Sequence, residues 1–153
     1  MRAAIAALIF MGAAPGARAD ALEGFDAAAL EICAAAVEAA GDEATVCVGV
    51  AARPCIEANG AATMSEALCW SEESVFWARR AEAAAQRLAA RDPARAAALS
   101  SVGKAFGQFV DQECSYRGAT FQGGSGAQPA MARCAAELWA VRAGMLTATE
   151  RAY

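Results

Sequence analysis

Apolar residues recur every three or four positions between residues 63 and 91, which is the spacing of one face of an α-helix. The members of this stripe are Trp70, Trp77, Ala81, Ala84 and Leu88. The charged residues of the segment fall largely on the other side: Glu72, Glu73, Arg79, Arg80 and Arg87. The pattern therefore predicts a long amphipathic helix with one buried face and one solvated face.

The sequence also carries signals for where this helix begins and ends. Thr63, with Glu66 three residues later, predicts a capping box at its start. Asp92 followed by Pro93 predicts the N-cap and first position of a second helix, so the first should end near Arg91. So short a connection predicts a tight antiparallel hairpin of two long helices.

Two further helices follow from the same kind of pattern. The second helix of the hairpin carries the stripe Leu99, Val102, Phe106, Phe109 and Val110. Pro129 is expected to open a third helix, with one face formed by Cys134, Leu138, Val141 and Met145. Residues 26–40 are expected to form a short helix that stops at Gly41. No stretch alternates in polarity as a strand does, so the prediction is an all-α bundle.

The first 19 residues have the organisation of a signal peptide. Arg2 precedes an apolar run over residues 5–11, and Ala17-Arg18-Ala19 provides a cleavage site before Asp20. A membrane anchor is the alternative, but this run is much shorter than the roughly 20 residues that span a bilayer. We therefore expect a periplasmic or secreted mature chain of residues 20–153.

Composition then narrows the class of partner. The chain has 13 basic and 17 acidic side chains. Removal of residues 1–19 takes away Arg2 and Arg18 and no acid, which leaves 11 basic side chains and a net charge of −6. Such a chain is unsuited to nucleic acid or anionic membranes and suits a basic partner. Much of the 58% hydrophobic fraction is alanine, which buries little area, so large core residues are few.

Six cysteines in a small exported chain are typical of a disulfide framework. Two pairs are separated by 14 positions, which a continuous helix would hold roughly 21 Å apart, so the chain must turn back between them. Both intervals contain a turn signal. Neighbour pairing is the simplest arrangement, although spacing does not fix the connectivity of the last four: Cys33 with Cys47, Cys55 with Cys69, and Cys114 with Cys134. Zinc is the alternative, but the chain has no histidine and no Cys-x-x-Cys pair.

The loop closed by the third cysteine pair is rich in glycine. Residues 123–126 read Gly-Gly-Ser-Gly, which suggests a phosphate cradle only superficially. The Lys-Ser/Thr that follows in a P-loop is missing, as is the preceding strand. We therefore expect a disulfide-closed loop between two helices.

A set of residues in fixed order carries a family resemblance: Cys55, Met64, Cys69, Trp77, Asp111, Cys114, Gly123-Gly124-Ser125, Cys134, Arg142 and Leu146. In this order and spacing, residues 55–146 resemble the LprI-type lysozyme-inhibitor-like domain, a family of small exported helical proteins with four cysteines. Together with the signal peptide predicted over 1–19, the resemblance divides the chain into a helical extension with two cysteines over 20–54 and an LprI-like domain over 55–153.

The chain departs from the family at several polar positions. Members usually have Asp, Leu-Asn and Tyr on the first long helix where this chain has Ala78, Ala81-Glu82 and Ala85. On the second helix they usually have Gln, Trp and Arg where it has Gly103, Phe106 and Val110. The scaffold is thus kept while most polar signature residues are replaced.

The functional expectation is binding, not catalysis. With no histidine and one lysine, most acid–base and nucleophilic arrangements are missing, and no metal or cofactor is expected. Neighbouring carboxylates, at 72–73 and at 111 with 113, are interpreted as solvated helix faces.

The resemblance and the negative charge imply a binding protein for a lysozyme or another basic envelope protein. Candidate contact residues are Asp111, Glu113, Tyr116, Arg117 and Phe121. The acids could instead only cap a helix, and the aromatics could pack onto their own bundle. A structural or interaction module of the cell envelope, with no inhibitor activity, remains the alternative function.

Overall fold

The computed structural model describes residues 22–153, so the predicted signal peptide and its cleavage site lie outside the described residues. All regular structure in the described part is helical, which confirms the predicted all-α class. The helices are α1 (Ala27–Ala40), α2 (Ala52–Ala58), α3 (Thr63–Arg91), α4 (Ala96–Ala119) and α5 (Ala127–Arg151), with 3₁₀ turns η1 (Ala44–Cys47) and η2 (Pro93–Arg95). Within residues 22–153, no helix is long and apolar enough to cross a membrane.

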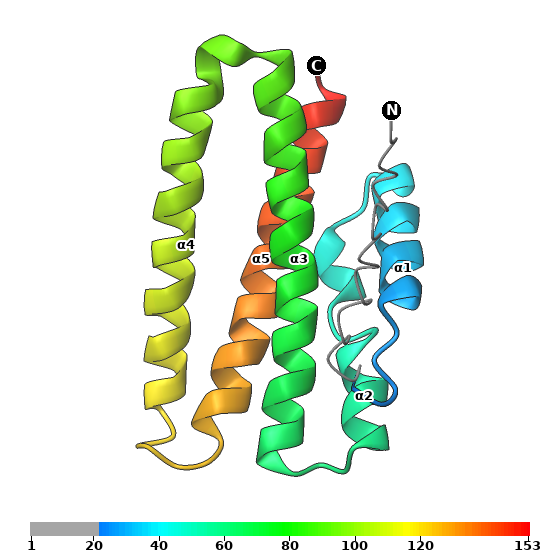
Figure 1. The fold of residues 1–153 in the computed structure, drawn as a ribbon, viewed down its shortest axis with the longest axis vertical. Coiled ribbons are helices and arrows are strands. Elements are labelled where there is room, and N and C mark those ends of the chain that lie inside the picture. The colour runs from blue at the N-terminus through cyan, green and yellow to red at the C-terminus, as the bar shows by residue number, and fades with distance from the viewer. Residues whose placement is uncertain (1–21) are drawn as a thin grey trace, which may run out of the picture.

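The α5 helix is the centre of the bundle. It packs against both α3 and α4, whereas α3 and α4 have few contacts with each other. Figure 1 shows α3 and α5 running in the same direction and α4 running opposite to both. The predicted hairpin is therefore present in the path of the chain, but its helices are not tightly packed, because α5 lies against both of them.

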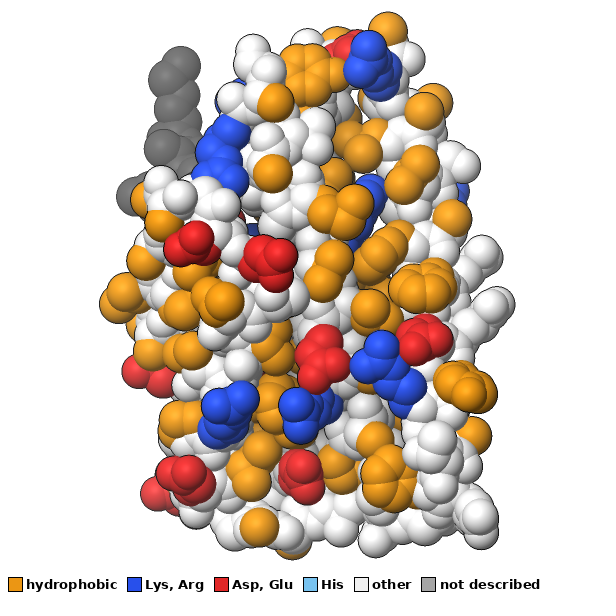
Figure 2. Space-filling model, turned by 180° about the vertical axis from the view of Figure 1, so that it is seen from behind, with side chains coloured by type: hydrophobic (Ala, Val, Ile, Leu, Met, Phe, Trp, Pro, Cys, Tyr) orange, Lys and Arg blue, Asp and Glu red, His pale blue; other side chains and the backbone are white. Residues whose placement is uncertain are grey.

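The main core lies between α3, α5 and the N-terminal segment. Trp77 is fully buried there, and Leu30 of α1 is its largest fully buried aliphatic neighbour in the core. The contribution from α5 is mainly alanine, which lets the long helices approach closely. The α4 helix contributes less, because Val110 is buried while Val102 and Phe109 of its predicted stripe stay half exposed. Figure 2 shows hydrophobic side chains gathered on the face formed by α4 and α5.

Two of the predicted helix starts are wrong in detail. Ala62 is the N-cap of α3 and Thr63 is its first residue, so the predicted capping box does not form. The α5 helix begins at Ala127, so Pro129 lies within its first turn, where a missing N–H costs no helical bond. Pro93 opens the 3₁₀ turn η2 before α4 begins.

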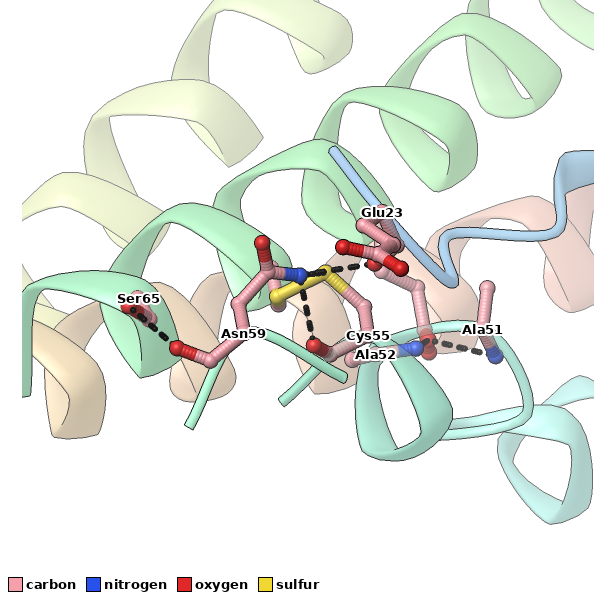
Figure 3. The surroundings of a disulfide bond; sticks show 8 residues. Glu23, Ala51, Ala52, Cys55, Asn59 and Ser65 are labelled. Atoms are coloured by element: carbon pink, nitrogen blue, oxygen red, sulfur yellow. Dashed lines mark hydrogen bonds between the residues drawn. A yellow bond between two sulfur atoms is a disulfide. The ribbon is translucent and has the colours of Figure 1, made fainter. Parts of the chain in front are cut away.

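An asparagine organises the connection before α3 in place of the capping box. The Asn59 side-chain amide donates to the carbonyl of Glu23 at 2.7 Å and to that of Cys55 at 2.8 Å, as Figure 3 shows. The Ser65 hydroxyl donates to the Asn59 carbonyl at 3.3 Å. These bonds tie α2, the start of α3 and the segment before α1 together.

The α1 helix has clear ends and is held on α3 by charge. Asp26 caps its start by accepting from the Ala29 amide at 2.9 Å, and Gly41 ends it at φ +80°, as predicted. Arg80 of α3 donates to both Glu31 and Glu38 of α1, at 2.6 and 2.9 Å. Burial alone would lower the pKa of Arg80, but these hydrogen bonds outweigh it and raise the pKa.

All six cysteines form disulfides between neighbours in the sequence. The bonds are Cys33–Cys47, Cys55–Cys69 and Cys114–Cys134, with Cα–Cα distances of 5.9, 5.8 and 5.5 Å. They join α1 to η1, α2 to α3, and α4 to α5 respectively. Each helix of the bundle therefore has a covalent link to the element that follows or precedes it.

Glu73 is fully buried, which corrects its interpretation as part of a solvated face. Its carboxylate accepts from the backbone amides of Gly49 at 2.6 Å, Ala51 at 3.3 Å and Ala52 at 2.8 Å. Figure 3 labels Ala51 and Ala52, whose amides make the last two of these bonds at the start of α2. Gly49 has a backbone φ of +92°, which residues other than glycine rarely adopt. In this conformation its N–H points to the carboxylate of Glu73. Glu72, the neighbouring acid, is exposed.

The C-terminal parts of α3 and α5 are joined by an ion pair. Because of this pair, we expect the free energy of unfolding to fall in acid. Arg87 donates to both carboxylate oxygens of Glu150, at 2.7 and 2.9 Å, and this hydrogen bonding lowers the pKa of Glu150. Because the folded pKa lies below the unfolded one, the stabilisation is present above the unfolded pKa and is lost as pH falls through the folded pKa. In Glu150→Gln, the free energy of unfolding should therefore fall less on acidification than in the native chain.

Urea unfolding measures this difference at two pH values. One is neutral, and the other lies about one unit below the ordinary pKa of a glutamate side chain, which is near 4.3. Glu57→Gln is the control, because Glu57 is exposed and makes no side-chain hydrogen bond or ion pair within the described chain. An equal acid response in native chain and Glu150→Gln would contradict the prediction.

Candidate functional site

The third disulfide holds the end of α4 against the start of α5. The α4 helix runs on to Ala119, so Tyr116 and Arg117 lie in its last turns and not in the loop. The loop itself is residues 120–126, closed by a bond from the Gly124 amide to the Phe121 carbonyl at 2.8 Å. The glycine-rich segment is therefore shorter than the cysteine spacing suggested, and helical structure positions most of the candidate residues.

The charged side chains at this end are paired with one another. Arg117 donates to Glu113 at 2.9 Å within α4 and to Glu137 of α5 at 3.3 Å. Glu137 also accepts from Arg133 at 2.9 Å. Figure 2 shows acidic and basic side chains lying side by side low on this face. All four side chains are about a third exposed or more, so the chain of ion pairs orients the surface and adds little to stability.

Three of the five candidate residues line one recess of about 590 Å³: Tyr116, Arg117 and Phe121. Tyr116 is 72% exposed and Phe121 is 48% exposed, so neither ring is packed away onto its own bundle. Glu113 joins this group through its bond to Arg117. We call these four residues the loop-end surface.

Asp111 is not part of the loop-end surface. It lines a separate recess between α4 and α5, together with Val110, Cys114 and Met131. Because it lies in a different recess from the other candidates, one small partner group cannot contact all five residues through a single recess.

The chemistry of the loop-end surface suits protein contact. It offers a phenol, a phenyl ring and a guanidinium that is fixed by two carboxylates. A disulfide and two helix ends hold these groups in place, which lowers the entropy lost on binding. Among residues 22–153, no group of three potential metal-ligating side chains lies close enough to hold an ion.

A third concave surface lies between α3 and α4, and it was not predicted from the sequence. It is a groove of about 550 Å³ in which alanine is the commonest lining residue, and α5 contributes Trp139, Arg142 and Leu146. The lining also includes five positions at which the chain departs from the polar pattern described above: Ala78, Ala81, Glu82, Ala85 and Gly103. These departures are scattered in the sequence, and only the fold brings them together.

A comparison with protein-family models matches residues 55–146 to the family described as lysozyme inhibitor LprI. The chain belongs to this family. The match begins at Cys55 in α2 and ends at Leu146 in α5, so it covers two of the three disulfides and all three recesses described above. The comparison with curated proteins found no match, and neither did the comparison with solved structures. The description of the family names an inhibitor and not an enzyme, which agrees with a binding role.

Proposed function

We propose that the protein is an exported inhibitor that binds a lysozyme through the loop-end surface. The observation that carries this proposal is the match of residues 55–146 to the lysozyme inhibitor LprI family. Export is supported by the predicted signal peptide over residues 1–19 and by three disulfides, because such bonds persist in oxidising compartments. The mature chain then starts at Asp20.

The loop-end surface supplies contact chemistry of the kind that anchors protein interfaces. Tyrosine, tryptophan and arginine carry a large share of interface energy, and large exposed aromatic side chains can enter a partner's cleft. Tyr116 and Phe121 are such side chains here, on a rim fixed by the disulfide. Residues 22–54 contribute by packing against α3 and α5.

The negative net charge acts at longer range. Lysozymes are typically basic enzymes that work through a carboxylate pair in a cleft. Because Glu113 and Glu137 are already paired with arginines, the charges at the contact itself are largely neutralised. Attraction should therefore come from the acidic molecule as a whole, which raises the association rate and weakens with salt.

The proposal predicts that removing both aromatic rings weakens inhibition by about tenfold or more, as expected for loss of interface anchors. The test compares Tyr116→Ala/Phe121→Ala with the native, oxidised mature protein against a panel of lysozymes. Ile32→Ala is a matched control, because Ile32 is also an exposed apolar residue, at 71%, but lies on α1. Inhibition constants are measured at low salt, where steering is strongest.

Two outcomes would contradict the proposal in different ways. If no lysozyme is inhibited at excess protein and low salt, inhibition is not the function, and an interaction module of the cell envelope becomes the better account. If inhibition is equal in the double variant and in Ile32→Ala, the protein is an inhibitor but its contact lies away from the loop-end surface.

A further inference from the structure

The groove between α3 and α4 has an apolar wall and a charged floor. Its volume of about 550 Å³ lies within the usual range for small-molecule sites. The apolar wall is formed by small side chains of α3 and α4 and by larger ones from three helices: Val75, Leu99, Trp139 and Leu146. None of the four candidate residues of the loop-end surface lines this groove.

Arg142 is the charged residue of the floor, and it is only 9% exposed. Within residues 22–153 its guanidinium makes neither a hydrogen bond nor an ion pair, and its one recorded side-chain contact is with an aromatic ring. Its guanidinium carbon lies 5.5 Å from the centre of the Phe106 ring. Burial lowers the pKa of Arg142, with no carboxylate to offset the desolvation.

This isolation contrasts with the other buried charge of the fold. Glu73 is surrounded by three backbone donors, as a buried carboxylate requires. Arg142 offers five N–H donors in a planar fork and meets no acceptor from residues 22–153, while none of its nitrogens is sealed off from solvent. A carboxylate entering the groove would supply such acceptors, because an arginine and a carboxylate can form two parallel hydrogen bonds.

The other charged side chains of the groove also favour a negatively charged ligand. Arg79 and Lys104 line it and are exposed, and Glu82 is the single acid in its lining. With three basic residues and one acid, the lining of the groove has a positive net charge, whereas the whole chain has a net charge of −4. Local charge in the groove therefore attracts an anion, although the molecule as a whole is acidic.

We propose that this groove binds a single-chain fatty acid, with the carboxylate on Arg142 and the alkyl chain along the alanine-rich wall. A slender alkyl chain can reach a guanidinium that is nine-tenths buried, and burial of each methylene favours binding. The proposal is independent of lysozyme inhibition, because it concerns another surface and another ligand.

Calorimetric titration of the oxidised protein with octanoate, decanoate and dodecanoate, each below its micelle concentration, tests the apolar part. One molecule is expected per chain, with the dissociation constant falling about fourfold for each added methylene. 1-Decanol and decyltrimethylammonium test the head group, and both are expected to bind at least about tenfold more weakly than decanoate. Equal binding of decanoate and 1-decanol, or no binding of any fatty acid, would overturn the proposal.

Two variants locate the ligand in the groove. Arg142→Met keeps the unbranched stem of the side chain and removes its guanidinium, and it should weaken decanoate at least about tenfold while leaving 1-decanol unchanged. Gly103→Leu should weaken both ligands, because a Cβ at Gly103 meets no atom within 4 Å and the added side chain fills the groove. Arg53→Met is the control, since Arg53 is exposed on α2 and does not line the groove.

Thermal unfolding separates a binding role from a structural one. Arg142→Met should melt no lower than the native protein, because it replaces an unpartnered buried charge by an apolar side chain. Gly103→Leu should also remain folded, since leucine favours helix over glycine. If Arg142→Met melts lower and still binds decanoate as tightly as Arg53→Met does, Arg142 has a structural role and the proposal fails.

Discussion

Reduction of the three disulfides is expected to unfold the protein under conditions in which the oxidised form is fully folded. In the chain-entropy model, each of these loops of roughly 15 to 21 residues stabilises the native state by about 3 kcal/mol, or roughly 9 kcal/mol together. The total stability of a domain this size is only about 5–15 kcal/mol. The core cannot make up the difference, because among residues 22–153 Trp77 and Leu30 are the only fully buried side chains larger than Glu73.

Far-UV circular dichroism and urea titration of oxidised protein and of reduced, alkylated protein measure this effect. The reduced form should lose most of its helical signal at room temperature, while the oxidised form should show a cooperative urea transition. Cys114→Ser/Cys134→Ser serves as a graded comparison, since it removes only the link between α4 and α5. A reduced protein that keeps a cooperative transition with an unchanged midpoint would show that packing alone maintains the bundle.

The order and type of the helices could be predicted from the sequence because those signals are local. The 3.6-residue stripe around Trp77 marks α3, and Gly41 ends α1 at the predicted residue. The cysteine intervals require the chain to turn back, and neighbour pairing, the simplest arrangement although spacing left the last four cysteines open, is what the structure has. The central place of α5 was not predictable, because no local pattern tells which helix an alanine-rich face will contact.

For the candidate sites too, the sequence predicted what depends on local signals and missed what depends on contacts between distant residues. The sequence placed Tyr116, Arg117 and Phe121 near the third disulfide, and the structure brings them to one recess. It also grouped Asp111 with them, but Asp111 lies six positions before Arg117 on the same helix, at about 100° per residue, so the two side chains leave different faces and Asp111 lines another recess. The isolation of Arg142 depends on which acids fail to reach it, and spacing along the chain cannot show this.

Glu73 is the residue for which the sequence held an unused signal. It lies three positions after Trp70 and four before Trp77, so helical geometry puts it on the buried stripe and not on the charged face. The charge of the Glu73 side chain suggested that it faces solvent, whereas its position on the helix indicated that it faces the core. The structure resolves the conflict by placing backbone donors of residues 49–52 around the carboxylate.

Replacement of Glu73 by alanine is therefore expected to lower the free energy of unfolding by about 3–5 kcal/mol, the cost of leaving buried polar groups without their charged partner. The three amides of Gly49, Ala51 and Ala52 would lose their acceptor, and the start of α2 would lose its only contact of this kind with α3 among the described residues. Glu73→Gln should cost less, about 2 kcal/mol, because its amide oxygen still accepts while its NH₂ group faces donors.

Urea unfolding of Glu73→Ala, Glu73→Gln and Glu72→Ala at neutral pH makes the comparison. Glu72 is the matched control because it is the adjacent acid on the same helix and is exposed. Its replacement should change the free energy of unfolding by no more than about 0.5 kcal/mol, as expected for a surface position. Equal losses in Glu72→Ala and Glu73→Ala would mean that the carboxylate does not hold residues 49–52, and the attachment of the N-terminal segment would then rest on the Cys55–Cys69 disulfide and the ion pairs of Arg80.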